Sequence, residues 1–211
     1  MTAKLQLALD DISLEKGLEL VKQVKDYIDI VEIGTPFMME YGMEAVRQVK
    51  AAVPEVEVLC DAKIMDAGYL EAKETFDAGA DYVTVLGVTD NLTIKDVVKA
   101  AKEANAKVMV DMITITDIAK RVAEVEELGV DVVAVHTGVD AQAAGRTPLE
   151  DLAEMSKHVD NTVTAVAGGI KVDTVADYMQ YNPQIIIVGG GILHADDPVQ
   201  AAKELKEQME A

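Results

Sequence analysis

The sequence has little cysteine, few basic residues and no long hydrophobic run. Its single cysteine excludes an internal disulfide framework and a four-cysteine zinc site. Only 19 basic residues face 38 acidic ones, and the resulting formal net charge of −19 would repel a phosphate backbone. No apolar run approaches the ~20 residues of a membrane span, and the first residues lack the pattern of a secretory signal. We therefore expect a cytoplasmic, soluble protein whose partners include no nucleic acid and no membrane.

What is present is a high apolar content. Half of the 211 residues are hydrophobic, which excludes a chain too polar to collapse. A compact domain of this length buries roughly 70% of its extended-chain surface, so one core suffices. No linker or low-complexity stretch divides the chain, and the sequence predicts one domain over residues 1–211.

Eight short apolar runs alternate with longer segments of helical period. Most runs are continuous stretches of Val, Ile and Leu, which is typical of parallel strands covered on both faces. The predicted strands are Leu5–Leu9, Ile28–Ile33, Val56–Ala62, Tyr82–Leu86, Lys107–Asp111, Val130–His136, Val163–Ala167 and Ile185–Val188.

The intervening segments show helix signals. From Leu14 to Val24 apolar residues recur at helical spacing, and Ser13 stands where an N-cap belongs. Asp117–Leu128 repeats this pattern. The last predicted helix, Pro198–Glu210, begins with a proline, which suits the first turn.

A weak internal repeat supports a regular architecture. Gly79-Ala80-Asp81 and Gly129-Val130-Asp131 each place a glycine just past a helix and an aspartate before the next strand. Eight units in this length allow about 26 residues each, near the lower limit of a (β/α)₈ barrel. A doubly wound sheet is the alternative, but no glycine-rich turn follows the first strand. We predict a single-domain (β/α)₈ TIM barrel of minimal length.

Polar residues end most of the predicted strands. In such a barrel the chemistry lies at the C-terminal ends of the strands, and ionisable groups there must be solvated, paired or metal-bound. Each of them could alternatively be a cap or turn residue, but their shared edge favours a functional site. The residues are Asp10, Glu32, Asp61, Lys63, Asp111 and His136.

Glycines follow the last two predicted strands, as Gly168-Gly169 and Gly189-Gly190-Gly191. Without a Cβ, backbone N–H groups can close on a phosphate, and these two loops are its usual place in barrels. The alternative is a pair of tight turns that merely need glycine. Their position on adjacent strands favours a phosphate, and hence a sugar phosphate as ligand.

The densest polar motif runs from Asp61 to Asp66, with Lys63 between them. Asp61 and Lys63 share one face of a strand, and a lysine between carboxylates stays protonated, ready to stabilise an enolate oxygen. Such a lysine is unsuited to a Schiff base. Glu32 and Asp61, on adjacent strands, could jointly hold Mg²⁺, with Mn²⁺ as a possible substitute.

These motifs resemble the orotidine 5′-monophosphate decarboxylase suprafamily over essentially the whole chain. Within it, the similar branch condenses D-ribulose 5-phosphate with formaldehyde to D-arabino-hex-3-ulose 6-phosphate. The resemblance implies a metal-dependent aldehyde-lyase that uses Mg²⁺ and works as a homodimer with shared active sites. It rests on residues 31–36 (VEIGTP), 61–68 (DAKIMDAG), 135–138 (VHTG), 140–143 (DAQA) and 166–171 (VAGGIK).

The resemblance also implies roles at matching positions. Metal-binding carboxylates correspond to Glu32 and Asp61, and the lysine at the enediolate corresponds to Lys63. An aspartate that reaches into the neighbouring subunit's site corresponds to Asp66. The proton-transfer histidine corresponds to His136.

Substrate contacts are implied as well. Asp10 matches a residue that contacts substrate hydroxyls. Asp111 is expected to be catalytic and Ala167 to contact substrate, at positions where the sister 3-keto-L-gulonate 6-phosphate decarboxylases carry Glu and Thr. The glycines expected at the phosphate are Gly168, Gly169, Gly190 and Gly191.

Three departures separate the branches. Orotidine decarboxylases carry a lysine where this chain has Glu32, and the carboxylate favours metal-assisted enediolate chemistry. The sister decarboxylases carry arginine where this chain has Val139, and they carry another where it has Gly191, so Lys171 is a possible substitute at the phosphate. The sister decarboxylase activity and a non-catalytic sugar-phosphate-binding barrel are the alternative functions.

Overall fold

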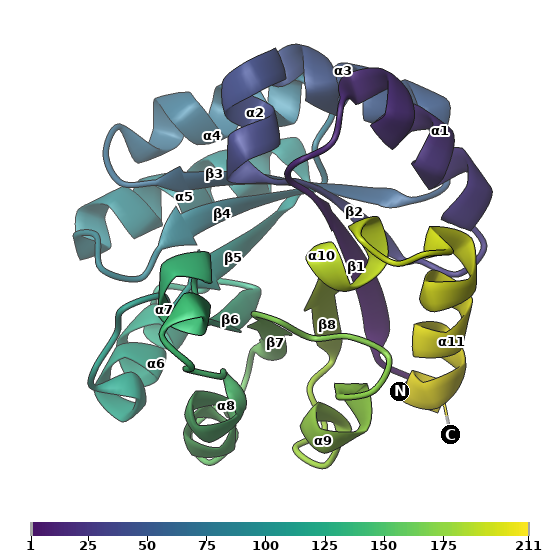
Figure 1. Ribbon diagram of the computed structural model, residues 1–211. Helices are drawn as coiled ribbons and strands as arrows, with labels where there is room; N and C mark the ends of the chain where they lie inside the picture. The colour runs from purple at the N-terminus through teal and green to yellow at the C-terminus, as the bar shows by residue number, and fades with distance from the viewer. Residues whose placement is uncertain (1, 211) are drawn as a thin grey trace.

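The computed structural model describes residues 2–210, in which eight parallel strands close into a barrel. Each strand pairs with the next in sequence, and β8 pairs with β1. Helices surround the strands (Figure 1), so the predicted (β/α)₈ barrel is confirmed. The strands are β1 Lys4–Leu9, β2 Ile30–Ile33, β3 Glu57–Ile64, β4 Tyr82–Leu86, β5 Lys107–Asp111, β6 Val132–His136, β7 Val163–Ala167 and β8 Ile185–Val188.

Most helices follow the predicted pattern. Ser13 caps the first by accepting a hydrogen bond from the Lys16 backbone N–H, as its position predicted. Asp117 caps α6 in the same way. The helices are α1 Leu14–Val24, α2 Thr35–Tyr41, α3 Met43–Ala52, α4 Gly68–Asp77, α5 Asn91–Ala104, α6 Ile118–Glu127, α7 Val139–Ala143, α8 Leu149–Met155, α9 Val175–Met179, α10 Gly190–Leu193 and α11 Pro198–Glu210.

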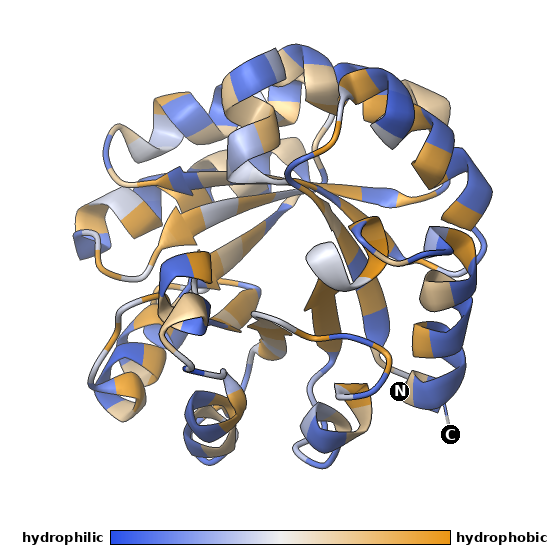
Figure 2. Ribbon diagram, viewed as in Figure 1, coloured by the Kyte–Doolittle hydropathy of each residue, from blue (hydrophilic) through white to orange (hydrophobic). Residues whose placement is uncertain are grey.

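The apolar residues form two separate clusters. The larger cluster lies between the sheet and the helices, whose hydropathy alternates along each ribbon in Figure 2. The smaller one consists of strand residues such as Ile30, Leu59 and Met109, which point into the barrel. Within residues 2–210, no helix combines the length and apolar character needed to cross a membrane.

A four-fold repeated contact joins the strands in pairs at their N-terminal ends. Asp29 accepts a hydrogen bond from the backbone N–H of Leu5 on β1, at 2.8 Å. Asp81, Asp131 and Gln184 do the same for β3, β5 and β7, at 2.7, 2.8 and 2.7 Å. Each cap precedes the next even-numbered strand. The weak internal repeat of glycine and aspartate in the sequence is therefore part of a structural unit of two strands.

These caps also explain two differences in strand boundaries. β2 begins at Ile30 and β6 at Val132, each two residues later than predicted. The preceding aspartates, Asp29 and Asp131, use their side chains as well as their backbone to bond the neighbouring strand. The chain is therefore still in a turn where apolar content alone predicts a strand.

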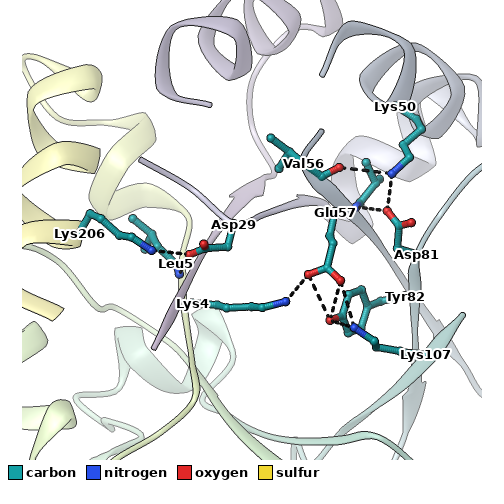
Figure 3. Close-up of polar contacts among 11 residues, drawn as sticks. Lys4, Leu5, Asp29, Lys50, Val56, Glu57, Asp81, Tyr82, Lys107 and Lys206 are labelled. Carbon is teal, nitrogen blue, oxygen red and sulfur yellow. Dashed lines mark hydrogen bonds and ion pairs between the residues drawn. The ribbon is translucent and has the colours of Figure 1, made fainter. Parts of the chain in front are cut away.

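A charged network fills the same end of the barrel (Figure 3). Lys4 and Lys107 both pair with Glu57, and Lys107 also donates a hydrogen bond to the Tyr82 hydroxyl at 2.8 Å. Lys206 on α11 pairs with Asp29 at 2.7 Å. These charged groups are paired with one another, so polar contacts stabilise this end of the barrel.

We predict that Asp131→Ala lowers the free energy of unfolding by about 1–3 kcal/mol, because it leaves the buried N–H of Val108 without an acceptor. Asp131→Asn keeps an oxygen acceptor, as Gln184 does in the fourth unit, and should lose much less. Urea unfolding of the three proteins measures the difference. Equal stability of the alanine variant and the parent would contradict the assigned cap.

Candidate active site

A cavity of about 1520 Å³ opens at the C-terminal ends of the strands. All six ionisable residues expected at this edge line it, from five different strands or the loops that follow them. The glycines after β7 and β8 line it too, with Ala167 beside them. The six residues are Asp10, Glu32, Asp61, Lys63, Asp111 and His136.

A chain of charged groups crosses the floor of this cavity. Lys63 on β3 forms ion pairs with Asp61 and, at 3.3 Å, with Asp111 on β5. Asp111 in turn lies 2.9 Å from Nδ1 of His136 on β6. Both carboxylates are buried, at 8% and 5% side-chain exposure, whereas Lys63 is accessible enough, at 24%, to meet a ligand.

The lysine is held in its cationic form. Burial alone lowers the pKa of Lys63, but the charges of Asp61 and Asp111 outweigh burial and raise this pKa above its ordinary value. The sequence predicted a flanked lysine but expected Asp66 as the second carboxylate. The second carboxylate is Asp111, while Asp66 falls beyond the strand, as its place in the sequence indicates, and is exposed with its side chain accepting a hydrogen bond from the N–H of Ala67.

Asp111 orients the histidine ring. Burial raises the pKa of the Asp111 carboxyl, but its hydrogen bond with His136 and nearby positive charges outweigh burial and lower the pKa. An ionised carboxylate at Nδ1 requires the proton on that nitrogen, which leaves Nε2 of neutral His136 as an acceptor. The Ile113 N–H donates to the other Asp111 oxygen at 2.9 Å and fixes the carboxylate.

Glu32 is buried, and within residues 2–210 it has no cationic partner at hydrogen-bond distance. Burial, assisted by the negative charge of Asp61, raises the pKa of Glu32 to about 8. The hydrogen bond that Glu32 accepts comes from the neutral amide of Gln6, at 2.6 Å. Burial and Asp61 also raise the pKa of Asp10. The floor of the cavity therefore holds more carboxyl groups than Lys63 can compensate once they ionise.

This surplus suits a divalent cation. Mg²⁺ prefers carboxylate oxygens and usually takes one or two of them, keeping water or substrate oxygens as its other ligands. Among residues 2–210, no three His, Cys, Asp or Glu side chains lie close enough together to hold a metal by themselves. The donor chemistry thus fits a cation bound by Glu32 and Asp61 and completed from solution.

Three uncharged residues missing from the sequence prediction support these carboxylates. Thr35 donates to Asp61 at 2.7 Å, and Thr84 donates to the other Asp61 oxygen at 2.8 Å. Gln6 supports Glu32 from β1. The signal was available in part: Gln6 and Thr84 stand at inward positions of their strands, two residues from Ala8 and Tyr82 in the barrel interior.

The glycines at the edge admit close backbone contacts. Gly168 has a φ of 126°, and a Cβ there would lie 2.7 Å from the carbonyl oxygen of Thr137. A Cβ at Gly191 would overlap the Ile170 carbonyl oxygen. These two glycines are therefore also required by the turns themselves, whereas Gly169 and Gly190 would meet side chains.

Two further cations line the cavity. Lys171 is largely exposed and pairs with Asp173 at 3.1 Å. Arg146, in the loop between α7 and α8, was not singled out in the sequence. Gly191 leaves no room for a side chain in this arrangement, so these neighbouring loops are what bring cations to this edge of the cavity.

The closed barrel and the polar cavity at the C-terminal ends of its strands are typical of a (β/α)₈-barrel enzyme, and comparison with known proteins agrees. The model of the orotidine 5′-phosphate decarboxylase / HUMPS family matches residues 3–205, and the chain belongs to this family. Within the family it is similar to 3-hexulose-6-phosphate synthases. The synthase of Bacillus subtilis (strain 168) is 48% identical over 204 residues, which cover 97% of each chain.

Solved structures give the same order of similarity. The crystal structure of 3-hexulose-6-phosphate synthase from Salmonella typhimurium is 50% identical with a TM-score of 0.96, covering 98% of each chain. That of 3-keto-L-gulonate-6-phosphate decarboxylase from Vibrio cholerae is 26% identical with a TM-score of 0.86, covering 100% of this chain and 98% of that one. The fold is shared widely, whereas the sequence is much nearer to the synthases.

We predict a pH-dependent stability that originates at Glu32. Its folded-state pKa of about 8 lies above the ordinary 4.5, so between these values the folded state binds more protons than the unfolded state. In chelator-treated protein, the contribution of Glu32 should therefore lower the free energy of unfolding as the pH rises from 5 to 8. Denaturant titrations at several pH values measure the slope.

The control for this prediction is Glu32→Gln, which removes the titrating group but keeps a similar shape. Its free energy of unfolding should fall less steeply over the same pH range. Identical slopes in the two proteins would exclude Glu32 as the source.

Proposed function

We propose that this chain is a 3-hexulose-6-phosphate synthase, a lyase that condenses D-ribulose 5-phosphate with formaldehyde to D-arabino-hex-3-ulose 6-phosphate and so fixes formaldehyde. The observation that carries the proposal is the linked set of His136, Asp111, Lys63 and Asp61 in one cavity. An acid–base residue beside a fixed cation is what enediolate chemistry requires. The 48% identity to the synthase of Bacillus subtilis supports this reaction among those of the family.

In the first step, Nε2 of His136 removes a proton from C1 of ribulose 5-phosphate. Asp111 holds the ring in the tautomer that can accept this proton and stabilises the imidazolium that forms. The electron pair left at C1 delocalises onto the C2 oxygen and gives an enediolate. Lys63, kept cationic by its two carboxylates, donates a hydrogen bond to that oxygen.

In the second step, C1 of the enediolate attacks the carbon of formaldehyde and a C–C bond forms. The formaldehyde oxygen takes up a proton, which the His136 imidazolium returns. We assign a Mg²⁺ site, with Mn²⁺ as a substitute, to Glu32 and Asp61. When bound, such an ion acts as a Lewis acid that makes the C1 proton more acidic.

The substrate is anchored away from the reacting atoms. We assign its phosphate to the loops after β7 and β8, where Gly169 and Gly190 are exposed residues whose backbone N–H groups could bind it, with Gly168 and Gly191 shaping the turns. Asp10 and Ala167 line the cavity near the substrate hydroxyls in this assignment. Binding energy from the phosphate then orients the far end of the sugar for proton transfer.

The alternative functions are less well supported. The 3-keto-L-gulonate-6-phosphate decarboxylase of Vibrio cholerae is 26% identical, about half the identity to the synthases. At the position where the sister decarboxylases carry arginine, this chain has an exposed valine, Val139. A barrel that only binds a sugar phosphate needs no base, and would leave the alignment of His136 with Asp111 unexplained.

The proposal predicts a formaldehyde-dependent loss of ribulose 5-phosphate and, without formaldehyde, exchange of its C1 proton in D₂O. His136→Ala should lower both rates at least ~10²-fold, because proton transfer has no base. His158→Ala, which removes a ring bonded to Glu154 outside the cavity, is the matched control and should keep both. Nuclear magnetic resonance follows the two reactions. Release of CO₂ from 3-keto-L-gulonate 6-phosphate with no use of formaldehyde would favour the sister activity instead.

We also propose a homodimer. Large apolar side chains are exposed on neighbouring units near Asp66, and such patches mark interfaces. They lie on α2, on the loops after β3 and β4, and at the starts of α4 and α5: Met39, Met65, Leu70, Val88 and Leu92. A second copy seated there would cover this patch and receive Asp66 toward its own cavity.

Sharing of sites predicts complementation between two inactive variants. A heterodimer of Lys63→Ala and Asp66→Asn chains contains one site with both substitutions and one with neither, so it should recover about half of the wild-type activity. Two affinity tags isolate the heterodimer for the assay. A pure heterodimer as inactive as its parents would show that Asp66 does not act across subunits.

A further inference from the structure

β4 brings no ionisable group to the cavity, yet one of its residues lines the floor. Thr84 points inward and is 4% exposed. Tyr82, two residues earlier on the same face, lies toward the other end of the barrel. There it packs in the inner apolar cluster and its hydroxyl accepts a hydrogen bond from Lys107. Thr84 is thus a buried hydroxyl placed among the charged groups of the site.

Opposite Thr84, the pairing between β3 and β4 is irregular. Cys60 pairs with Val83 and Ile64 pairs with Val85, so three residues of β3 lie opposite Thr84 alone. Within this bulge Lys63 adopts a φ of 46°, in the left-handed region that side chains disfavour. The bulge removes Lys63 from the regular ladder, and its backbone N–H needs another acceptor.

The Thr84 side chain supplies that acceptor. The Lys63 N–H donates to Thr84 Oγ1 at 2.9 Å, and the same hydroxyl donates to Asp61 Oδ1 at 2.8 Å. One oxygen therefore fixes the backbone of the lysine and the side chain of the aspartate at once. The other Asp61 oxygen takes hydrogen bonds from Thr35 and Lys63.

We infer that Thr84 is a positioning residue that sets Lys63 and Asp61 relative to each other for the reaction. This inference rests on the proposed function, because it concerns the enediolate formed there. Thr84 acts through the two charged residues without contacting the reacting atoms. Misplacement of such groups by about 1 Å can cost ~10²-fold in rate.

The test uses pairs of variants that differ only at the hydroxyl. Thr84→Val keeps the shape of threonine and loses the oxygen, while Thr84→Ser keeps the oxygen. Thr84→Ala differs from the serine variant by that oxygen alone and fits without strain, so it serves where the valine variant does not fold. Thr75→Val is the matched control, since it removes a buried threonine hydroxyl that bonds the Glu71 carbonyl on α4, outside the site.

We expect Thr84→Val and Thr84→Ala to lower kcat about 100-fold. The KM for ribulose 5-phosphate should change less than about threefold, because the phosphate anchors lie across the cavity on the loops after β7 and β8. Thr84→Ser and Thr75→Val should retain most of the wild-type kcat. A valine or alanine variant with near-normal kcat, or a serine variant as impaired as alanine, would overturn the inference.

A second measurement reads the bond independently of activity. Amide hydrogen exchange at Lys63, followed by nuclear magnetic resonance, should be slow in the parent and Thr84→Ser proteins and at least about tenfold faster in Thr84→Ala, which lacks the acceptor. Equal protection in the serine and alanine variants would refute the contact. A parent chain without synthase activity would overturn the proposed function, while the exchange data would still decide whether Thr84 holds Lys63.

Discussion

The arrangement of the cavity depends on the ion pairs that Lys63 forms with Asp61 and Asp111. These charges are mostly withdrawn from water, and removing one partner of a buried pair leaves an uncompensated charge at a cost of about 3–5 kcal/mol. The lysine belongs to β3 and its second partner to β5, so their attraction acts across the intervening strand β4. His136 extends the same set to β6 through Asp111. One connected set of contacts thus fixes the position and charge of Lys63 and the tautomer of His136.

Much of this could be predicted because parallel strands impose a common direction. When every strand of a closed barrel runs the same way, the residues that end the strands must meet at one edge. The sequence alone could thus place Asp10, Glu32, Asp111 and His136 at one edge of the barrel, although it could not give the distances between them. The glycines after β7 and β8 followed by the same argument.

The rest depended on features that periodicity does not encode. A bulge shifts the register of β3, and no change in apolar spacing indicates it. The pairing of Lys63 with Asp111 joins strands that are far apart in sequence, so spacing along the chain does not predict it either. The supporting residues Thr84 and Gln6 are uncharged and stand in strands that otherwise read as core. Their importance comes from what lies opposite them, which only the pairing of strands reveals.

The repeated caps at the other end of the barrel have a consequence for how such an enzyme changes over time. Asp29, Asp81, Asp131 and Gln184 fasten the sheet far from the cavity, with their own carboxylate or amide oxygens. These contacts between strands therefore do not involve the loops that carry the chemistry. Sequence drift in those loops can alter which substrate is accepted while the frame beneath them persists, as the similar frames and divergent sequences of the family's decarboxylases illustrate.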